Sequence, residues 1–447
     1  MILKRIYNDA LAHASYLVGC PGAGEAVIVD PNREIDQYIE LAGVEKLKIV
    51  AIAETHIHAD YLSGARELAL RTGATLYLSD EGPPDWKYQF AHEPGVRAVK
   101  EGFSFRVGSI RFDVLRTAGH TPEHISFVVT DEASSTAPLG IFSGDFVFVG
   151  DVGRPDLLEN AAGVADSAGP AAKELYASLQ RLLAFPEHLL ILPCHGAGSA
   201  CGKSLGGVPF SSLGYERLSN WALKPINEND FVERVLDGQP DPPKYFAQMK
   251  KLNKEGPAIL GGVKCPPRLD RSPDGLLIDT RPSEEYLAGH GPSSLHVPLG
   301  SSFLKYSGWL VPYGTDLYLL AANEHQALDA TSALSLIGLD QVRGWYGPDL
   351  LERSELKRND QIFFSELDAQ PDSSVVLDVR TRDEWDEGHI AGAVHIPVGR
   401  IVDRHAQIPK GKRIFVHCSS GTRSPMAVSL LERLGFDDVV NIADGYS

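Results

Sequence analysis

The sequence predicts an α/β protein of several domains. Its 447 residues correspond to about three domains at roughly 150 residues each. In the N-terminal part, short apolar runs alternate with stretches of helical composition, which is the pattern of layered α/β folds. In the C-terminal part, one sequence motif occurs twice, 99 positions apart. Such a repeat indicates two copies of one structural unit of roughly 90 residues.

Composition narrows the function classes. Hydrophobic residues make up 43% of the chain and charged residues 23%, which is ordinary for a globular protein. The 42 basic and 59 acidic residues give a net charge of −17, so a broad basic face for nucleic acid is not expected. The N-terminus has no apolar segment of signal-peptide length, and no stretch approaches a membrane span. The five cysteines are scattered, so we expect a reducing cytoplasm rather than a disulfide framework.

Two breaks divide the chain. A stretch rich in Pro, Gly and Asp at 237–243 has the composition of a turn or linker, and a second loose stretch follows at 264–268. Beyond them the repeat aligns Asp279 with Asp378, together with the Arg two positions after each Asp. The predicted domains are residues 1–245, 258–355 and 362–447.

Polar side chains follow the predicted strands of the first domain. Residues 49–53 and 189–192 are apolar and short enough for buried strands, and 64–72 has helical composition with Ser63 as the expected N-cap. In layered α/β folds the loops that follow such strands collect at one edge of the sheet. We therefore expect the residues of these loops to converge on one site.

Four blocks of residues suitable for metal binding occur in these loops. Two histidines and one carboxylate form the facial triad that leaves three positions open on iron(II). A single histidine is usually a hydrogen-bonded core or surface residue, and a single aspartate is usually a cap. Four blocks in this order, each at a strand end, favour a metal site. The candidate residues are His56, His58, Asp60, His120, Asp145 and His195.

The first block departs from a known signature at one position. The pattern H-x-H-x-D-H characterises the metallo-β-lactamase superfamily, and this chain has Tyr61 where the last histidine is expected. A phenol is mostly protonated at neutral pH and is a poor ligand for a divalent metal. The substitution therefore predicts one metal rather than two.

Two further runs give a more specific resemblance. Residues 143–157 (SGDFVFVGDVGRPDL) and 194–203 (CHGAGSACGK) resemble the persulfide (sulfur) dioxygenase branch of that superfamily, and the resemblance covers about residues 1–245. It implies an αββα sandwich holding one iron(II) per chain. The residues alone do not decide between His56 and His58, and that choice comes from the resemblance. It implies that the ligands are His56, His120 and Asp145, with His58, Asp60 and His195 holding ligands and water by hydrogen bonds.

Three more residues of this domain have open roles. Arg154 and Asp156 lie within eleven residues after Asp145. A structural ion pair that braces the loop is at least as well supported as a role in contacting substrate. Cys201 lies six residues after His195 in a loop rich in Gly and Ser, where it could be exposed near the iron as a sulfur relay or could be structural. Cys20 and Cys194 are most simply small apolar residues.

A cysteine loop marks the last domain. A predicted strand at 413–416 and a predicted helix at 424–434 flank Cys418-Ser419-Ser420-Gly421-Thr422-Arg423. A thiol that faces backbone N–H groups at a helix N-terminus is shifted toward the reactive thiolate. The C-x4-R spacing is one residue shorter than the C-x5-R loop of cysteine phosphatases, so it should hold sulfur better than phosphate. It resembles the rhodanese sulfurtransferases, which implies catalytic roles for Cys418 and Arg423.

The middle copy lacks these groups. Aligning the repeats through Gly338 and Gly435 places Ala321 at the position of Cys418 and Gln326 at that of Arg423. Without a nucleophile and a guanidinium, this copy is predicted to be inactive and to serve as a spacer or docking domain.

The whole chain thus resembles a persulfide dioxygenase–rhodanese fusion. This implies oxidation of glutathione or coenzyme A persulfide by dioxygen to sulfite and thiol, with Cys418 moving sulfur between persulfide, sulfite and thiosulfate. One alternative is a glyoxalase-II-like dinuclear thiolester hydrolase fused to a sulfurtransferase, and another is a non-catalytic persulfide carrier or sensor. The preferred thiol, the direction of sulfur transfer and the formation of a homo-oligomer are left open.

Overall fold

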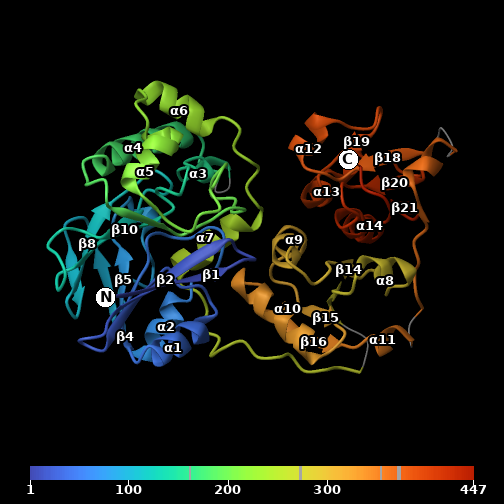
Figure 1. Ribbon diagram of the computed structural model, residues 1–447. Coiled ribbons are helices and arrows are strands. Elements are labelled where there is room, and N and C mark those ends of the chain that lie inside the picture. Colours follow the sequence, from blue (N-terminus) through green and yellow to red (C-terminus); the bar gives the residue numbers. More distant parts are fainter. Residues whose placement is uncertain (161–162, 271–273, 353–354, 370–373, 447) are drawn as a thin grey trace. The chain divides into compact units, whose positions relative to one another are not determined.

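The computed structural model describes residues 1–160, 163–270, 274–352, 355–369 and 374–446. Its chain forms two compact units (Figure 1). The first contains Met1–Val263 together with Ser335–Gly338, and the second contains Lys264–Leu334 and Leu339–Ser447. The first unit thus includes residues beyond the boundary expected at 245.

The first unit is built on two six-stranded sheets of consecutive strands. The first sheet consists of β1 (Ile2–Asn8), β2 (His13–Cys20), β3 (Glu25–Val29), β4 (Lys48–Ala53), β5 (Thr75–Ser79) and β6 (Val96–Val99). The second consists of β7 (Ser104–Val107), β8 (Ile110–Arg116), β9 (Ile125–Asp131), β10 (Gly140–Gly144), β11 (Leu190–Pro193) and β12 (Ser211–Ser212).

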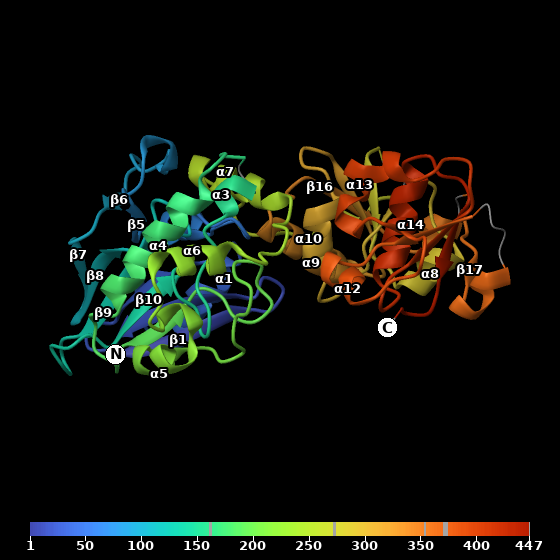
Figure 2. The same cartoon turned by 90° about the horizontal axis from the view of Figure 1, so that it is seen from above.

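The two sheets pack face to face and are covered by helices on their outer faces. Alternate residues of both sheets, such as Val27 and Phe112, form one buried apolar cluster between them. Helices α1 (Ile35–Val44) and α2 (Ala65–Thr72) bury their apolar faces on the first sheet. Helices α4 (Ala168–Leu182) and α6 (Glu228–Leu236) do the same on the second (Figure 2). The predicted αββα sandwich is confirmed.

The second unit contains two parallel sheets of matching strand order. One has the order β14-β13-β15-β16, and the other repeats it as β19-β18-β20-β21 with β17 added at its edge. Their strands are β13 (Leu276–Asp279), β14 (Leu295–His296), β15 (Leu317–Leu320), β16 (Val342–Tyr346), β17 (Gln361–Ile362), β18 (Val375–Asp378), β19 (Val394–His395), β20 (Ile414–His417) and β21 (Val439–Ile442). The aligned Asp279 and Asp378 end equivalent strands, so the sequence repeat corresponds to a structural repeat.

The two copies pack against each other through helices. In α14 (Arg423–Arg433), Ser429 Oγ accepts a hydrogen bond from the main-chain N of His296 at 3.0 Å, and Glu432 pairs with Nε2 of His290 at 2.9 Å. Helix α9 (Phe303–Leu310) of the middle copy packs on η4 (Val398–Arg400) of the last copy.

The remaining elements connect these layers. They are α3 (Leu157–Asn160), α5 (Leu213–Ser219), α7 (Tyr245–Glu255), α8 (Ser283–Ala288), α10 (Glu324–Leu336), α11 (Asp349–Glu352), α12 (Arg382–Glu387), α13 (Ile401–Arg404), η1 (Pro84–Trp86), η2 (Trp221–Leu223), η3 (Phe364–Ala369) and η5 (His405–Gln407). Among the described residues, no helix is both long and apolar enough to cross a membrane.

The predicted elements agree with the structure to within one or two residues. The strands expected at 49–53, 189–192 and 413–416 are β4, β11 and β20. Helix α2 begins one residue later than expected, with Gly64 rather than Ser63 at its N-cap. The Ser63 hydroxyl still accepts a hydrogen bond from the main-chain N of Ala65, so it satisfies one donor of the first turn.

Candidate metal centre and cysteine loop

The loop after β4 supplies the first group of polar side chains, and Asp30 fixes its start. The Asp30 carboxylate accepts hydrogen bonds from Thr55 N at 2.7 Å and from Thr55 Oγ1 at 3.0 Å. Because the Thr55 hydroxyl proton is used on Asp30, its oxygen accepts the proton on Nδ1 of His56, 3.0 Å away. His56 therefore keeps a lone pair on Nε2, the atom that a metal would bind.

His120, in the loop between β8 and β9, is oriented in the same way. Its Nδ1 donates to the main-chain oxygen of Arg154 at 2.9 Å, which leaves the lone pair on Nε2. Burial lowers the pKa of both His56 and His120 well below the usual value, with further lowering from neighbouring cationic groups. Both rings are therefore neutral at physiological pH and available as ligands.

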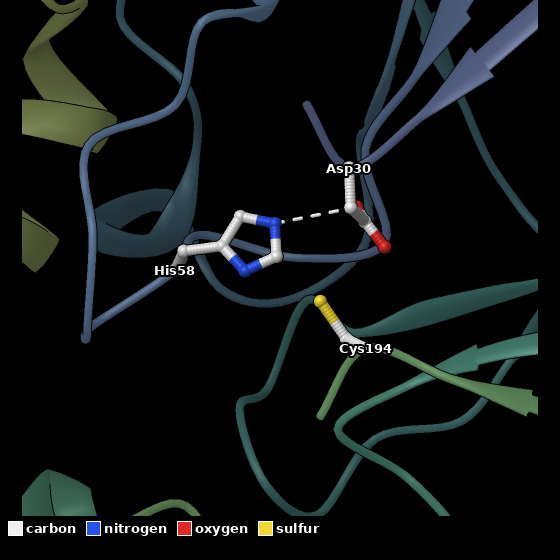
Figure 3. A group of neighbouring side chains, drawn as sticks. All are labelled: Asp30, His58 and Cys194. Carbon is white, nitrogen blue, oxygen red and sulfur yellow. Dashed lines mark hydrogen bonds and ion pairs between the residues drawn. The ribbon is translucent and has the colours of Figure 1, made fainter. Parts of the chain in front are cut away.

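His58 makes a different set of contacts. Its Nε2 donates to Oδ1 of Asp30 at 3.2 Å, with the Cys194 thiol beside the pair (Figure 3). Burial alone would lower the pKa of His58, but Asp30 outweighs it and raises the pKa to about 9. Asp30, His58 and Cys194 lie close enough to hold an ion. Because the Asp30 oxygens are already bonded to Thr55 and His58, we interpret the group as a network that braces the loop. His56 and His58 thus differ in their hydrogen bonds: the nitrogen without a partner among the described residues is Nε2 in His56 and Nδ1 in His58.

Asp145 directly follows Gly144, the last residue of β10. Gly144 has a φ of +52°, and an added Cβ would lie 2.5 Å from Thr55 Oγ1, so a larger residue does not fit there. The turn brings Asp145 Oδ2 to 3.4 Å from Nε2 of His120 and 3.9 Å from Nε2 of His56. Burial raises the pKa of this carboxyl to about 6.

These three side chains suit a divalent metal. One ligand atom from each of His56, His120 and Asp145 lies within 4.8 Å of the others, and all three side chains are fully buried. Among the described residues, neither Nε2 atom and neither Asp145 oxygen has a hydrogen-bond partner. Buried polar atoms without partners cost free energy, and a bound cation would remove that cost. Two imidazoles and a carboxylate fit iron(II) or zinc(II).

A second cluster adjoins this one. Nε2 of His195 lies 3.3 Å from Oδ2 of Asp60 and 3.3 Å from Oδ1 of Asp145. Cys201 completes the cluster, and its thiol is 1% exposed, so the exposed position considered for it is not found. Burial, together with the nearby carboxylates, raises the pKa of Cys201 well above its usual value. A buried, protonated thiol is poorly suited to a sulfur relay, but it could be deprotonated by a metal.

The Tyr61 hydroxyl bonds to the main chain. The hydroxyl donates to the main-chain oxygen of Asp30 at 3.3 Å, and the ring packs on His13 and His58. Burial raises the pKa of Tyr61 well above its usual value, which keeps the phenol protonated.

Arg154 and Asp156 form a buried ion pair. Arg154 Nε and Nη2 donate to the two Asp156 oxygens at 2.8 and 2.6 Å. Arg154 N also donates to the main-chain oxygen of Cys201 at 3.1 Å. Since the Arg154 oxygen binds His120, the pair connects the Cys201 loop to a candidate ligand. This geometry matches the loop-bracing interpretation rather than contact with substrate.

The cysteine loop lies in the second unit between β20 and α14. Cys418 follows β20 directly and is 1% exposed, and its thiol donates to Ser424 Oγ at 3.5 Å. Gly421 has a φ of +74°, which allows the chain to turn back into the helix. The loop therefore places the sulfur at the N-terminal end of α14, as the sequence predicted.

Arg423 has a partner that the sequence motif did not reveal. Its Nη1 and Nη2 donate to the two Glu384 oxygens, both at 2.6 Å, and Nη2 also donates to Ser419 Oγ at 2.6 Å. Hydrogen bonds from Arg423 lower the pKa of Glu384, which keeps this carboxylate charged. Glu384 belongs to α12 and lies 39 positions from Arg423 in the sequence. With nearby residues it forms the N-terminal capping box of α12, so the sequence around it does not indicate the pairing with Arg423.

The middle copy contributes to the surroundings of the cysteine loop. Ala321 follows β15 as Cys418 follows β20, and the Gln326 side chain bonds to the main chain of Ala322. From α9 of this copy, Tyr306 lies within electrostatic reach of Cys418 and Arg423. The copy with Ala321 at this position thus packs beside the cysteine loop.

Comparisons with known proteins bear on both units. Residues 8–195 match the metallo-β-lactamase superfamily and residues 364–447 match the rhodanese-like domain. The crystal structure of a metallo-β-lactamase from Staphylococcus aureus subsp. aureus COL aligns with a TM-score of 0.71 and 39% identity, covering 78% of this chain and 98% of that one. The mitochondrial persulfide dioxygenase ETHE1 of Mus musculus is 27% identical over 53% of this chain and 81% of its own length. A hydroxyacylglutathione hydrolase of Polaromonas sp. is 30% identical over 44% of this chain and 66% of its own length.

Proposed function

The chain belongs to the metallo-β-lactamase superfamily and carries a C-terminal rhodanese-like domain, and from this premise we propose that it is an iron-dependent persulfide dioxygenase with sulfurtransferase activity. The observation that carries the proposal is the convergence of two neutral imidazoles and one carboxylate, whose Nε2 and carboxylate oxygen atoms have no hydrogen-bond partner among the described residues. The likeness to a persulfide dioxygenase supports the same substrate class.

His56, His120 and Asp145 would hold one iron(II) per chain. The bound metal would supply activation of dioxygen and of the persulfide sulfur. The net reaction consumes R–S–S⁻, O2 and H2O and yields R–SH, sulfite and one proton. In this reaction the S–S bond breaks, the outer sulfur is oxidised and dioxygen is reduced. Thr55 and Arg154 hold the two imidazole rings in the tautomer that the metal requires.

Cys418 would carry out the transfer of sulfane sulfur. Its thiolate attacks the outer sulfur of thiosulfate, forming a cysteine persulfide and releasing sulfite. In the reverse direction, sulfite takes the outer sulfur of the cysteine persulfide and leaves as thiosulfate. The Arg423 guanidinium, held by Glu384, places a positive charge beside the loop where these anions react.

One observation favours a second function. Both carboxylate oxygens of Asp60, and the His195 Nε2 that lies 3.3 Å from Asp60 and from Asp145, also have no hydrogen-bond partner among the described residues. With Cys201 they could hold a second metal despite Tyr61, which would suit a dinuclear thiolester hydrolase such as a glyoxalase II. The likeness to a hydroxyacylglutathione hydrolase is consistent with this alternative. A carrier or sensor that binds persulfide without turnover would lack both activities.

Metal counting and oxygen uptake separate the three functions. The protein would be purified without oxygen, loaded with iron and given glutathione persulfide or coenzyme A persulfide. A dioxygenase should contain about one iron per chain and consume oxygen with one of these substrates. Two metals per chain, falling to one in Cys201→Ala, together with thiolester hydrolysis would support the hydrolase. Binding of persulfide without oxygen uptake would support the carrier.

The proposed setting is a reducing cytoplasm. All five cysteines, each within the described ranges, are free thiols. The substrates of both proposed activities are small sulfur compounds that occur where thiols stay reduced.

A further inference from the structure

Helix α7 (Tyr245–Glu255) lies beyond the expected end of the first domain, yet it contacts the metal loop directly. The Asn253 side-chain nitrogen donates to the main-chain oxygens of His58 and Tyr61, both at 2.8 Å. Its side-chain oxygen accepts a hydrogen bond from the main-chain N of Ser63 at 2.9 Å. Asn253 therefore ties α7 to the loop that contains His56.

Lys250 lies three positions before Asn253, on the same face of α7. Its side chain is 6% exposed, and among the described residues its Nζ has no hydrogen-bond partner. The ammonium lies 5.1 Å from the centre of the Trp86 ring, a weak interaction compared with an ion pair. Lysine is almost never buried without a partner, because a charge removed from water needs compensation.

The groups around this ammonium are those of the metal centre. Lys250 lies within electrostatic reach of His120, of Glu123, of Cys201 and of the Arg154–Asp156 pair. Among the described residues none of these acidic groups hydrogen-bonds to Lys250: Asp156 bonds to Arg154, and Glu123 Oε1 accepts from Ile57 N at 2.8 Å while its Oε2 has no partner. Burial lowers the pKa of Lys250 to about 8, so most of the lysine is still charged at pH 7.

We propose that Lys250 is the anion-binding group of the metal centre and that its partner is the reacting sulfur anion, which is the persulfide on entry and sulfite on exit. The inference rests on the proposed function, because that function brings these anions beside His120. The carboxylates and phosphates of the carrier thiol are not the expected partners, since they lie far from the reacting sulfur while Lys250 is enclosed. An ammonium can donate several hydrogen bonds to an anion, and such charge-assisted bonds are the strong ones.

The test measures sulfite binding to the iron-loaded full-length protein by calorimetry without oxygen. Lys250→Met keeps the length of the side chain and removes the charge, and it should weaken sulfite binding by about tenfold or more. Lys251→Met changes the neighbouring lysine, which is exposed, and should bind sulfite as the wild type does. Lys250→Arg retains the charge and should recover part of the affinity.

Thermal unfolding and iron content separate anion binding from a structural role. A buried charge without a partner destabilises the fold, so Lys250→Met should retain its iron and unfold at the same or a higher temperature than the wild type. Unchanged sulfite affinity in Lys250→Met would overturn the inference. It would also be overturned if Lys250→Met lost iron and stability and Lys250→Arg showed the same losses.

Oxygen uptake then distinguishes this inference from the proposed function. If the wild type consumes oxygen with persulfide and Lys250→Met does so with the same KM, only the inference fails. If the wild type consumes no oxygen but binds sulfite through Lys250, the proposed function fails while the anion site stands.

Discussion

Nδ1 of His120 donates to the main-chain oxygen of Arg154 at 2.9 Å, and the Arg154 side chain is itself held by a carboxylate. The orientation of a candidate metal ligand therefore depends on an ion pair that does not touch the metal. A carbonyl oxygen can only accept a hydrogen bond, so the proton of the His120 ring must lie on Nδ1. The Arg154 carbonyl therefore leaves Nε2 of His120 free to bind a metal.

The first prediction tests this support. Asp156→Asn removes the negative charge that holds Arg154, so the loop that carries the Arg154 carbonyl should shift. Groups that orient metal ligands typically affect metal affinity by about 10- to 100-fold, and we expect a loss of iron affinity in this range. Competition with a chelator would measure it. Glu132→Gln, in the more exposed pair with Arg106, is the matched control and should leave iron affinity unchanged.

The second prediction separates the two histidines of the first block. His56→Ala and His120→Ala each remove an Nε2 ligand and should abolish iron binding and oxygen uptake. His58→Ala should retain most of its iron, because His58 Nε2 is bonded to Asp30. Iron analysis after desalting measures all three variants. Retention of iron by His56→Ala together with its loss in His58→Ala would reverse the assignment.

The fold could be predicted from local patterns, whereas the supporting residues could not. Apolar runs such as 49–53 identify strands, and the residues that follow them must collect at one edge of a sheet. The roles of Asp30, Glu384 and Lys250 at these sites carry no local signal, because their partners there are distant in the sequence. Glu384, for example, meets Arg423 only when α12 and α14 pack beside one sheet. Cys201 was uncertain for a related reason: a loop rich in Gly and Ser suggests exposure, but tertiary packing buries it.

The third prediction concerns the nucleophile of sulfur transfer. Cys418→Ser should lose all thiosulfate sulfurtransferase activity, because the middle copy has Ala321 at the equivalent position. Oxygen uptake should persist, since the iron ligands belong to the other unit. Cys265→Ser changes a partly exposed cysteine of the middle region and should leave transferase activity unchanged. Residual transferase activity in Cys418→Ser would reveal a second nucleophile elsewhere in the chain.

The fourth prediction concerns the pH range of the Arg423–Glu384 pair. Because the folded-state pKa of Glu384 is lowered, the pair contributes stability above the unfolded value of about 4.3 and loses it only as the pH falls through the lowered value. The pair should thus be intact throughout pH 5 to 9. Glu384→Gln releases Arg423 and should lower transferase kcat/KM by about tenfold to hundredfold, by a similar factor across this range. A defect that appears only at the acidic end would contradict this account.

The last prediction is that the two active domains work in sequence on one pool of sulfur. Sulfite and thiol persulfide are the product and the substrate of the proposed iron site, and a rhodanese makes thiosulfate from these same two compounds. Joining the sites in one chain raises the effective concentration of each near the other, typically to the millimolar range for short linkers. Given persulfide and oxygen, the intact protein should therefore release thiosulfate together with, or in place of, sulfite. Cys418→Ser should accumulate sulfite at an unchanged rate of oxygen uptake, and adding a separate rhodanese at equal concentration should restore thiosulfate only in part. Equal ratios of sulfite to thiosulfate from the intact protein and from Cys418→Ser would leave two independent activities on one chain.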